Sequence, residues 1–253
     1  MPYSDDQLRQ IDKAIIEWID RQENLTLNLL TTQLQDQRAR EFLLHGLSRR
    51  INMLRHCLDR SFEAIPPAQQ NPSREAMMDA TAFIQTFFVN VYGSLDNLAH
   101  IWCHEINLMD KGVFIEQKFV GLGPRIKKVR QSLPDKVQRY LRQTDGWFSY
   151  LEDYRHSLAH RIPLYIPPCR LDRDAQRNYE SLDDQRKHAS RERNWNLANE
   201  LLYKMDKLGV FEPYIMHSFG EGARPVIFHS QLICDFATVV EIGELILKAL
   251  EER

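Results

Sequence analysis

The stretch YRHSLAHRIPLYIPP, residues 154–168, places an arginine and two histidines within six residues of one another. A guanidinium keeps its positive charge and can hold a phosphate through two donors. An imidazole nearby can exchange a proton with a ribose hydroxyl or with a leaving oxygen near neutral pH. Arg155 and His160 therefore provide a minimal set of groups for cleaving RNA without a metal ion.

The helix expected here places these side chains on different parts of its circumference. Each helical residue advances by about 100°, so His156 and His160 share a face, whereas Arg155 and His160 are about 140° apart. Pro163 disfavours helical backbone at the residue before it, so the helix should end near Arg161. A loosened last turn would let Arg155 and His160 converge, and its unpaired carbonyls would favour a protonated imidazole.

The elements that must position this motif are predicted to be mainly helices. Apolar residues spaced three and four apart predict a first helix that starts after Ser4 and a second that ends at Pro66 and Pro67. Ser73 is the expected N-cap of a third helix of about nine turns. This third helix is apolar around much of its circumference, so we expect it at the centre of the fold.

Helices are also expected on both sides of the motif. Pro124 and Pro134 suit the first turns of two short helices, and the motif helix should begin at Asp145. Residues 170–196 are dense in both signs of charge, which favours an exposed helix over a mobile arm. The basic run RIKKVR at residues 125–130 fits a solvated helix face better than a nucleic-acid contact.

The C-terminal part of the chain is predicted to add a small β element. The segments LYIPP, PYIMHSF and PVIFH are short and rich in β-branched or aromatic residues, and GEGARP would form a turn between the last two. His217 and His229 should lie at the surface or in turns near this hairpin. Ser230 is the expected N-cap of a final helix.

Together these elements predict one mainly α domain over residues 1–253. Its helical bundle core would cover residues 4–165, followed by a charged helix and a small β hairpin or sheet at residues 166–230. A C-terminal helix at residues 230–253 would pack back on the bundle.

The composition of the chain bears on which partners it can bind and on the cellular compartment in which we expect it. A formal net charge of −2 gives no global field toward nucleic acid or an anionic membrane, so RNA contact requires a local patch. The four cysteines are far apart and show neither zinc spacing nor the density of a secreted disulfide protein. The N-terminal residues do not resemble a targeting segment, and no apolar run reaches the roughly 20 residues of a membrane span. We therefore expect a cytoplasmic protein with no membrane partner.

The motif RHSLAH resembles the R-x4-6-H motif of the HEPN superfamily, whose members are helical and include many metal-independent ribonucleases of toxin and defence systems. The order of helices is similar over roughly residues 30–165. Asp96 in YGSLDNLAH resembles the acidic residue that the long helix of this family often carries. His156 differs from the family pattern, which most often has Asn after the arginine.

This resemblance implies a HEPN-like up-down helical bundle and a role for each motif residue. Arg155 would bind the scissile phosphate of RNA, His160 would act as general acid or base, and His156 would assist. The ribose 2′-hydroxyl would be the nucleophile and a cyclic phosphate the product, with no metal or cofactor. It also implies a homodimer in which two motifs face one cleft, and an antitoxin or other protein as a possible partner.

Two other interpretations of these residues stay open. Cations in the last turn of a helix suit its dipole, so the motif could be structural in a non-catalytic interaction or nucleotide-binding module. Asp96, His100 and His104 are spaced four apart and could form part of a metal site, but polar residues on a buried helix more often bond one another. We expect Asp96 and His100 to support the motif helix, with Asp96 orienting one of its histidines.

Overall fold

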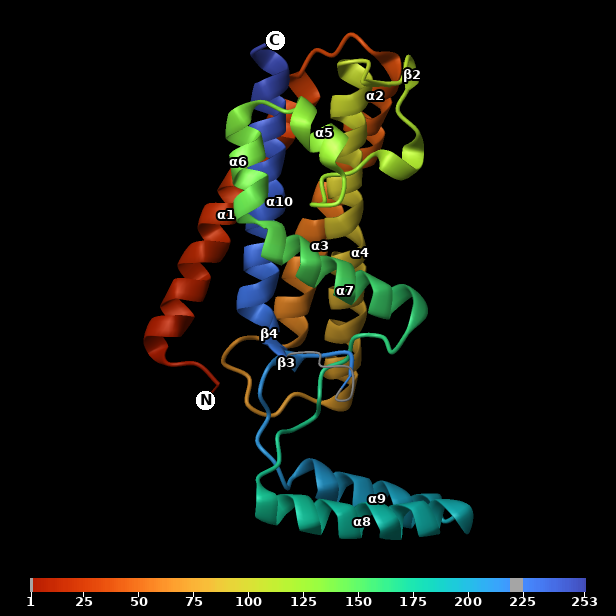
Figure 1. The fold of residues 1–253 in the computed structure, drawn as a ribbon. Coiled ribbons are helices and arrows are strands. Elements are labelled where there is room, and N and C mark those ends of the chain that lie inside the picture. The colour runs from red at the N-terminus through yellow and green to blue at the C-terminus, as the bar shows by residue number, and fades with distance from the viewer. Residues whose placement is uncertain (1, 219–224) are drawn as a thin grey trace.

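The computed structural model describes residues 2–218 and 225–253, and these form a mainly α-helical fold with two small antiparallel sheets (Figure 1). The mainly α fold with a small C-terminal β element and a final helix is therefore confirmed. The elements are α1 (Asp5–Thr31), α2 (Gln37–Glu41), the π-helical turn η1 (Phe42–Leu47), α3 (Ser48–Ala64), α4 (Arg74–Glu105), β1 (Met109–Asp110), β2 (Val113–Phe114), the 3-10 turn η2 (Gln117–Phe119), α5 (Lys127–Ser132), α6 (Asp135–Gln143), α7 (Asp145–His160), α8 (Arg173–Arg191), α9 (Trp195–Asp206), β3 (Tyr214–Ile215), β4 (Val226–Ile227) and α10 (Phe228–Glu251).

The two predicted N-caps of the long helices are confirmed. The Ser4 hydroxyl accepts a hydrogen bond from the Gln7 backbone N–H, and the Gln7 side chain accepts one from the Ser4 N–H, which completes a capping box. The Ser73 hydroxyl accepts from the Ala76 N–H at 3.0 Å. Each bond satisfies backbone donors that the first turn of a helix would otherwise leave unpaired.

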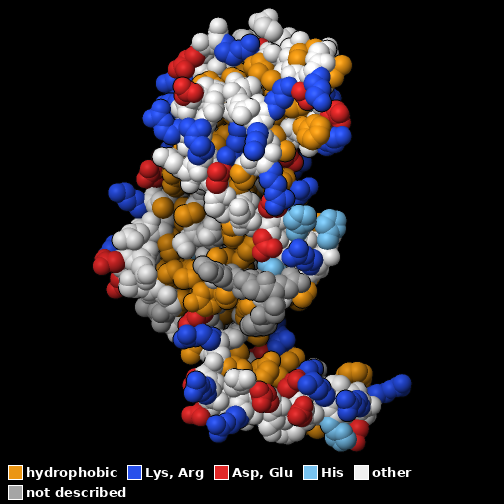
Figure 2. All heavy atoms as spheres, in the orientation of Figure 1, with side chains coloured by type: hydrophobic (Ala, Val, Ile, Leu, Met, Phe, Trp, Pro, Cys, Tyr) orange, Lys and Arg blue, Asp and Glu red, His pale blue; other side chains and the backbone are white. Residues whose placement is uncertain are grey.

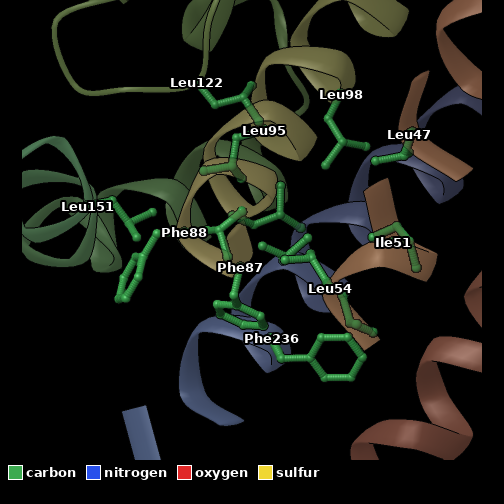
Figure 3. Packing of buried hydrophobic residues seen from close by; sticks show 14 of the residues in the cluster. Leu47, Ile51, Leu54, Phe87, Phe88, Leu95, Leu98, Leu122, Leu151 and Phe236 are labelled. Carbon is green, nitrogen blue, oxygen red and sulfur yellow. The ribbon is translucent and has the colours of Figure 1, made fainter. Parts of the chain in front are cut away.

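The long helix α4 lies at the centre of the fold, as its apolar circumference predicts. Its buried side chains pack against α3, α7 and α10, and Figure 3 shows Phe87 and Phe236 meeting near the middle of this core. The C-terminal helix α10 runs along α1 and α4, so the last residues of the chain complete the hydrophobic core. Burial of this continuous apolar surface is the main force that fixes the position of α7.

One glycine on α4 permits a close approach that bears on the site. A Cβ atom at Gly93 would lie 2.3 Å from the Arg50 guanidinium, so the lack of a side chain lets Arg50 lie against the helix. Arg50 donates hydrogen bonds to the side-chain oxygens of Asn97 at 3.0 Å and Asn90 at 3.3 Å. A cation is therefore fixed beside the middle of α4.

The β element joins the three segments that the sequence predicts. Strands β3 and β4 pair antiparallel, and Tyr165 pairs with Met216 through an isolated bridge. The predicted turn GEGARP falls mostly on residues 219–224, outside the described residues. The prediction for the last helix is wrong at its start, because α10 begins at Phe228 with Ile227 as N-cap, two residues before Ser230. The hairpin of β1 and β2 is not predicted, because two-residue strands carry no periodicity.

The charged segment after the motif is helical, as predicted, and it continues into a second helix. Helices α8 and α9 pair with each other and project from the body of the fold (Figure 1). They share a small core of their own, with Ala189, Ala198 and Leu201 buried and Leu182 packed against them. An ion pair between Arg74 and Asp206, at 2.6 Å, ties the end of α9 to the start of α4.

No helix in the described ranges is both long enough and apolar enough to cross a membrane.

Candidate functional site

The motif helix α7 presents one face to the core and the other to solvent. Phe148, Leu151 and Tyr154 are buried, and the ring of Tyr154 lies 5.1 Å from that of Phe88 on α4. The helix ends at His160, and the Arg161 N–H caps it by donating to the Ser157 carbonyl at 3.1 Å. The bounds predicted from the apolar spacing and Pro163 are thus confirmed.

The arginine and the histidine of the motif do not meet within one chain. Because α7 stays α-helical as far as His160, the loosened last turn that would bring Arg155 and His160 together is absent from it. The two side chains remain about 140° apart around the helix axis. Arg155 faces α4, whereas His160 lies with His156 at the exposed end of α7.

Arg155 is held against an aromatic ring of α4. Its guanidinium carbon lies 4.1 Å from the centroid of the Tyr92 ring, within the range of a cation–π interaction. Asp96 follows Tyr92 by one helical turn and lines the same pocket as Arg155. Burial raises the pKa of the Asp96 carboxyl, while the nearby Arg155 and Arg50 guanidiniums lower it by smaller amounts.

A pocket of about 290 Å³ lies between α4, the start of α7 and the loop over residues 120–126. Arg155 and two further cations, Lys118 and Arg125, line this pocket, as do the carboxylates of Asp96 and Glu152. Arg125 and Glu152 form an ion pair at 3.2 Å. Lys118 is likewise paired with Glu116, at 2.7 Å, so Arg155 is the cation of this pocket that is most available to an anion.

The histidines lie together on the surface where α7 ends. The rings of His156 and His160 are 6.2 Å apart, and both residues are exposed. Figure 2 shows a histidine patch beside Lys and Arg side chains on the right side of the molecule, about half-way along its length. The Glu152 carboxylate is 4.0 Å from His156 Nε2, so Glu152 lies between the pocket and the histidines. Sequence reasoning missed Glu152, although its spacing of four from His156 is a signal for such a pair.

Of the two residues expected to support the motif, Asp96 lies near the motif helix, as predicted. Asp96 lies beside Arg155 and not beside a motif histidine, so the prediction that it orients a histidine is wrong. His100 lies one turn further along α4, where its ring stacks on Phe42 of η1 at 4.5 Å. His104 continues this stack toward Phe114 at 4.6 Å. Among the described residues, no group of three His, Cys, Asp or Glu side chains is placed to hold a metal ion.

Asp153, on a different side of α7, connects the motif helix to the β element. Its carboxylate lies 3.1 Å from Nε2 of His217, which follows β3. His217 and His229 are each only 1% exposed, so a surface position is wrong for both. His217 lies at a bend after β3, which agrees with the predicted turn, whereas His229 lies within α10. The contact of Asp153 with His217 links α7 to the segment that follows β3.

The chain matches no known family model, no curated protein and no solved structure. The likeness to HEPN proteins therefore depends on RHSLAH and on the order of helices.

In chemical terms the site offers two separate functions on one helix. The pocket can hold an anion through Arg155. The exposed imidazoles of His156 and His160 are groups that can accept or donate protons.

Proposed function

We propose that this protein is a HEPN-like, metal-independent endoribonuclease that acts at a cleft shared by two copies of the chain. The observation that supports this most is the fixed position of Arg155. Its guanidinium is held over Tyr92 at the wall of the pocket, and the exposed His156 and His160 are on the same helix. A phosphate donor and proton carriers on one short element are the groups that RNA cleavage requires.

In this proposal Arg155 holds the scissile phosphate. The ribose 2′-oxygen attacks phosphorus, the bond from phosphorus to the 5′-oxygen breaks, and a 2′,3′-cyclic phosphate forms. One imidazole takes the proton of the 2′-hydroxyl, and a second gives a proton to the departing 5′-oxygen. His160 fills these roles and His156 assists.

In this proposal a second copy of the chain supplies the group that one α7 helix cannot bring to the phosphate. Arg155 and His160 of one chain point about 140° apart, so one phosphate cannot reach both over a single helix. A two-fold pairing of α7 ends would bring His160 of one copy toward Arg155 of the other. Such an enzyme would be a cytoplasmic toxin or defence protein, with an antitoxin or another protein as partner.

The rival function is a non-catalytic module that binds a nucleotide in the same pocket. The observation that favours it is the separation of Arg155 from His160 within the chain. Binding at Arg155 would then have no proton carrier at the phosphate.

Incubation of the purified protein with mixed RNA and EDTA separates the two functions. The ribonuclease should cleave RNA despite the chelator, and Arg155→Ala or His160→Ala should reduce the rate by about 100-fold or more. Arg177→Ala and His188→Ala, at exposed positions of α8, are matched controls and should keep full activity. Uncleaved RNA under all conditions favours the rival, and a monomeric mass in gel filtration refutes the shared cleft.

A further inference from the structure

The Asp96 side chain is only half-buried, and its carboxylate oxygens stay accessible from the pocket. Among the residues that the structure describes, it forms no hydrogen bond and no ion pair, although it lines the pocket beside Arg155. A carboxylate that faces a pocket and has no hydrogen-bond donor beside it can accept hydrogen bonds from a ligand there.

The cations near Asp96 are engaged elsewhere. Arg50 donates to Asn97 and Asn90, and Arg155 lies over the Tyr92 ring. They lower the pKa of Asp96 through space, but neither occupies its oxygen atoms. Both carboxylate oxygens therefore remain open to donors from the pocket, unlike those of Glu152, which pairs with Arg125.

Part of the pocket wall is apolar. Leu95 and Leu122 line it from α4 and the following loop, and Figure 3 shows these two side chains next to each other. Phe148 and Ile126 add further apolar surface. A volume of about 290 Å³ is small for a ligand site, and it fits a nucleobase better than a larger molecule.

We infer that this pocket binds the guanine base of a guanosine nucleotide, with the Asp96 carboxylate accepting two hydrogen bonds from the base and Arg155 holding the phosphate. Guanine alone among the four RNA bases presents two adjacent donors, N1–H and the exocyclic amino group, on its Watson–Crick edge. Tyr92 and Asp96 are one turn apart on α4, so Arg155 over the Tyr92 ring and the Asp96 carboxylate would contact two different parts of one nucleotide. The inference deepens the proposed function and rests on it for the assignment of Arg155 to the phosphate.

Calorimetric titration of the full chain with the 3′-monophosphates of guanosine, inosine, adenosine and cytidine tests the inference. Guanosine should bind about 10- to 100-fold more tightly than adenosine or cytidine, because a bidentate pair discriminates by that amount. Inosine, which lacks the amino group, should fall in between. Asp96→Asn should abolish the preference, while the matched exposed position on the same helix, Asp79→Asn, should keep it.

Two further measurements distinguish recognition from a structural role of Asp96. Arg155→Ala should weaken all four nucleotides by a similar factor, since it acts on the phosphate. Because burial raises the pKa of Asp96, the preference for guanosine should decline on acidification before an ordinary exposed Asp would be protonated. This pH series uses the unaltered chain and stands even if Asp96→Asn does not fold.

The outcomes separate this inference from the proposed function. Guanosine preference that depends on Asp96, without RNA cleavage, refutes the ribonuclease and leaves the base site intact. Cleavage or binding that is equal for all four bases overturns the base site, as does an absence of nucleotide binding at millimolar concentration. Loss of the preference in Glu152→Gln, with the preference kept in Asp96→Asn, overturns the assignment to Asp96.

Discussion

Two buried groups on α10 should make the stability of this protein depend on pH in opposite directions. Asp235 is fully buried and accepts hydrogen bonds from Trp147 Nε1 at 2.7 Å and from the Gln231 amide at 2.8 Å. Burial raises the pKa of Asp235 to about 7, because neither partner carries a positive charge to balance the carboxylate.

The pKa of His229 is shifted in the opposite direction, downward. Its Nε2 lies 2.7 Å from the Ile65 carbonyl, which can only accept, so Nε2 carries the proton. Nδ1 then accepts from the Tyr3 hydroxyl at 3.0 Å. Burial lowers the pKa of His229 to about 4, because a second proton would create an unpaired buried cation.

The signs of the two contributions follow from these pKa values. Asp235 has a folded pKa above its usual value of 3.8, so its contribution to stability is complete at low pH and is lost as pH rises through about 7. His229 has a folded pKa below its usual 6.5, so its contribution is complete above pH 6.5 and is lost as pH falls through about 4. Each group changes the free energy of unfolding by about 1.4 kcal/mol per pH unit, in opposite directions, so the two changes nearly cancel between pH 4.5 and 6.5.

In Asp235→Asn, the contribution of His229 to the pH dependence of the free energy of unfolding should become measurable. Between pH 4.5 and 6.5, the free energy of unfolding of the variant should rise by about 3 kcal/mol relative to that of the unaltered chain. Urea unfolding followed by circular dichroism at several pH values measures this difference, and Asp79→Asn serves as an exposed control. A difference that does not change with pH would show that Asp235 is ionised in the folded state and would refute the reasoning.

Three further changes test the packing. Phe87→Ala, at the fully buried centre of α4, should lower the free energy of unfolding by about 3–5 kcal/mol through cavity formation, as urea unfolding would show. Gly209→Ala should cost about 1–3 kcal/mol by the same measurement, because its Cβ would lie 2.6 Å from the Arg170 carbonyl oxygen. Ser73→Ala removes the cap bond to the Ala76 N–H and should lower the thermal midpoint by the equivalent of about 1 kcal/mol, whereas no shift would contradict its role as N-cap.

Local signals were sufficient for the helices and for the bounds of the motif. Ser4, Ser73 and Pro163 act on their own neighbourhoods, so their effects can be predicted without knowing the fold. The same holds for the apolar circumference of α4, which predicts a central position whatever its neighbours are. The start of α10 was mispredicted because Ser230 offers a cap, but Phe228 is buried in the core and extends the helix.

Contacts between distant segments could not be predicted in the same way. His229 is buried because Tyr3 and Ile65 supply its partners, 226 and 164 residues away along the chain. Arg50 reaches α4 only because the register of two helices aligns it with Gly93. For the same reason, the type and spacing of Asp96 and Arg155 suggested a site but not which side chain of the motif Asp96 would face.

The projecting pair of α8 and α9 resembles a segment inserted into the body of the fold. Arg170 and Val210 exchange backbone hydrogen bonds at 2.8 and 3.1 Å, so the chain leaves and re-enters the body at adjacent points. The intervening residues keep their own small core and contribute none of the buried residues of the main one. This segment is consequently where the chain could lengthen, shorten or be exchanged during evolution with least disturbance to the motif helix.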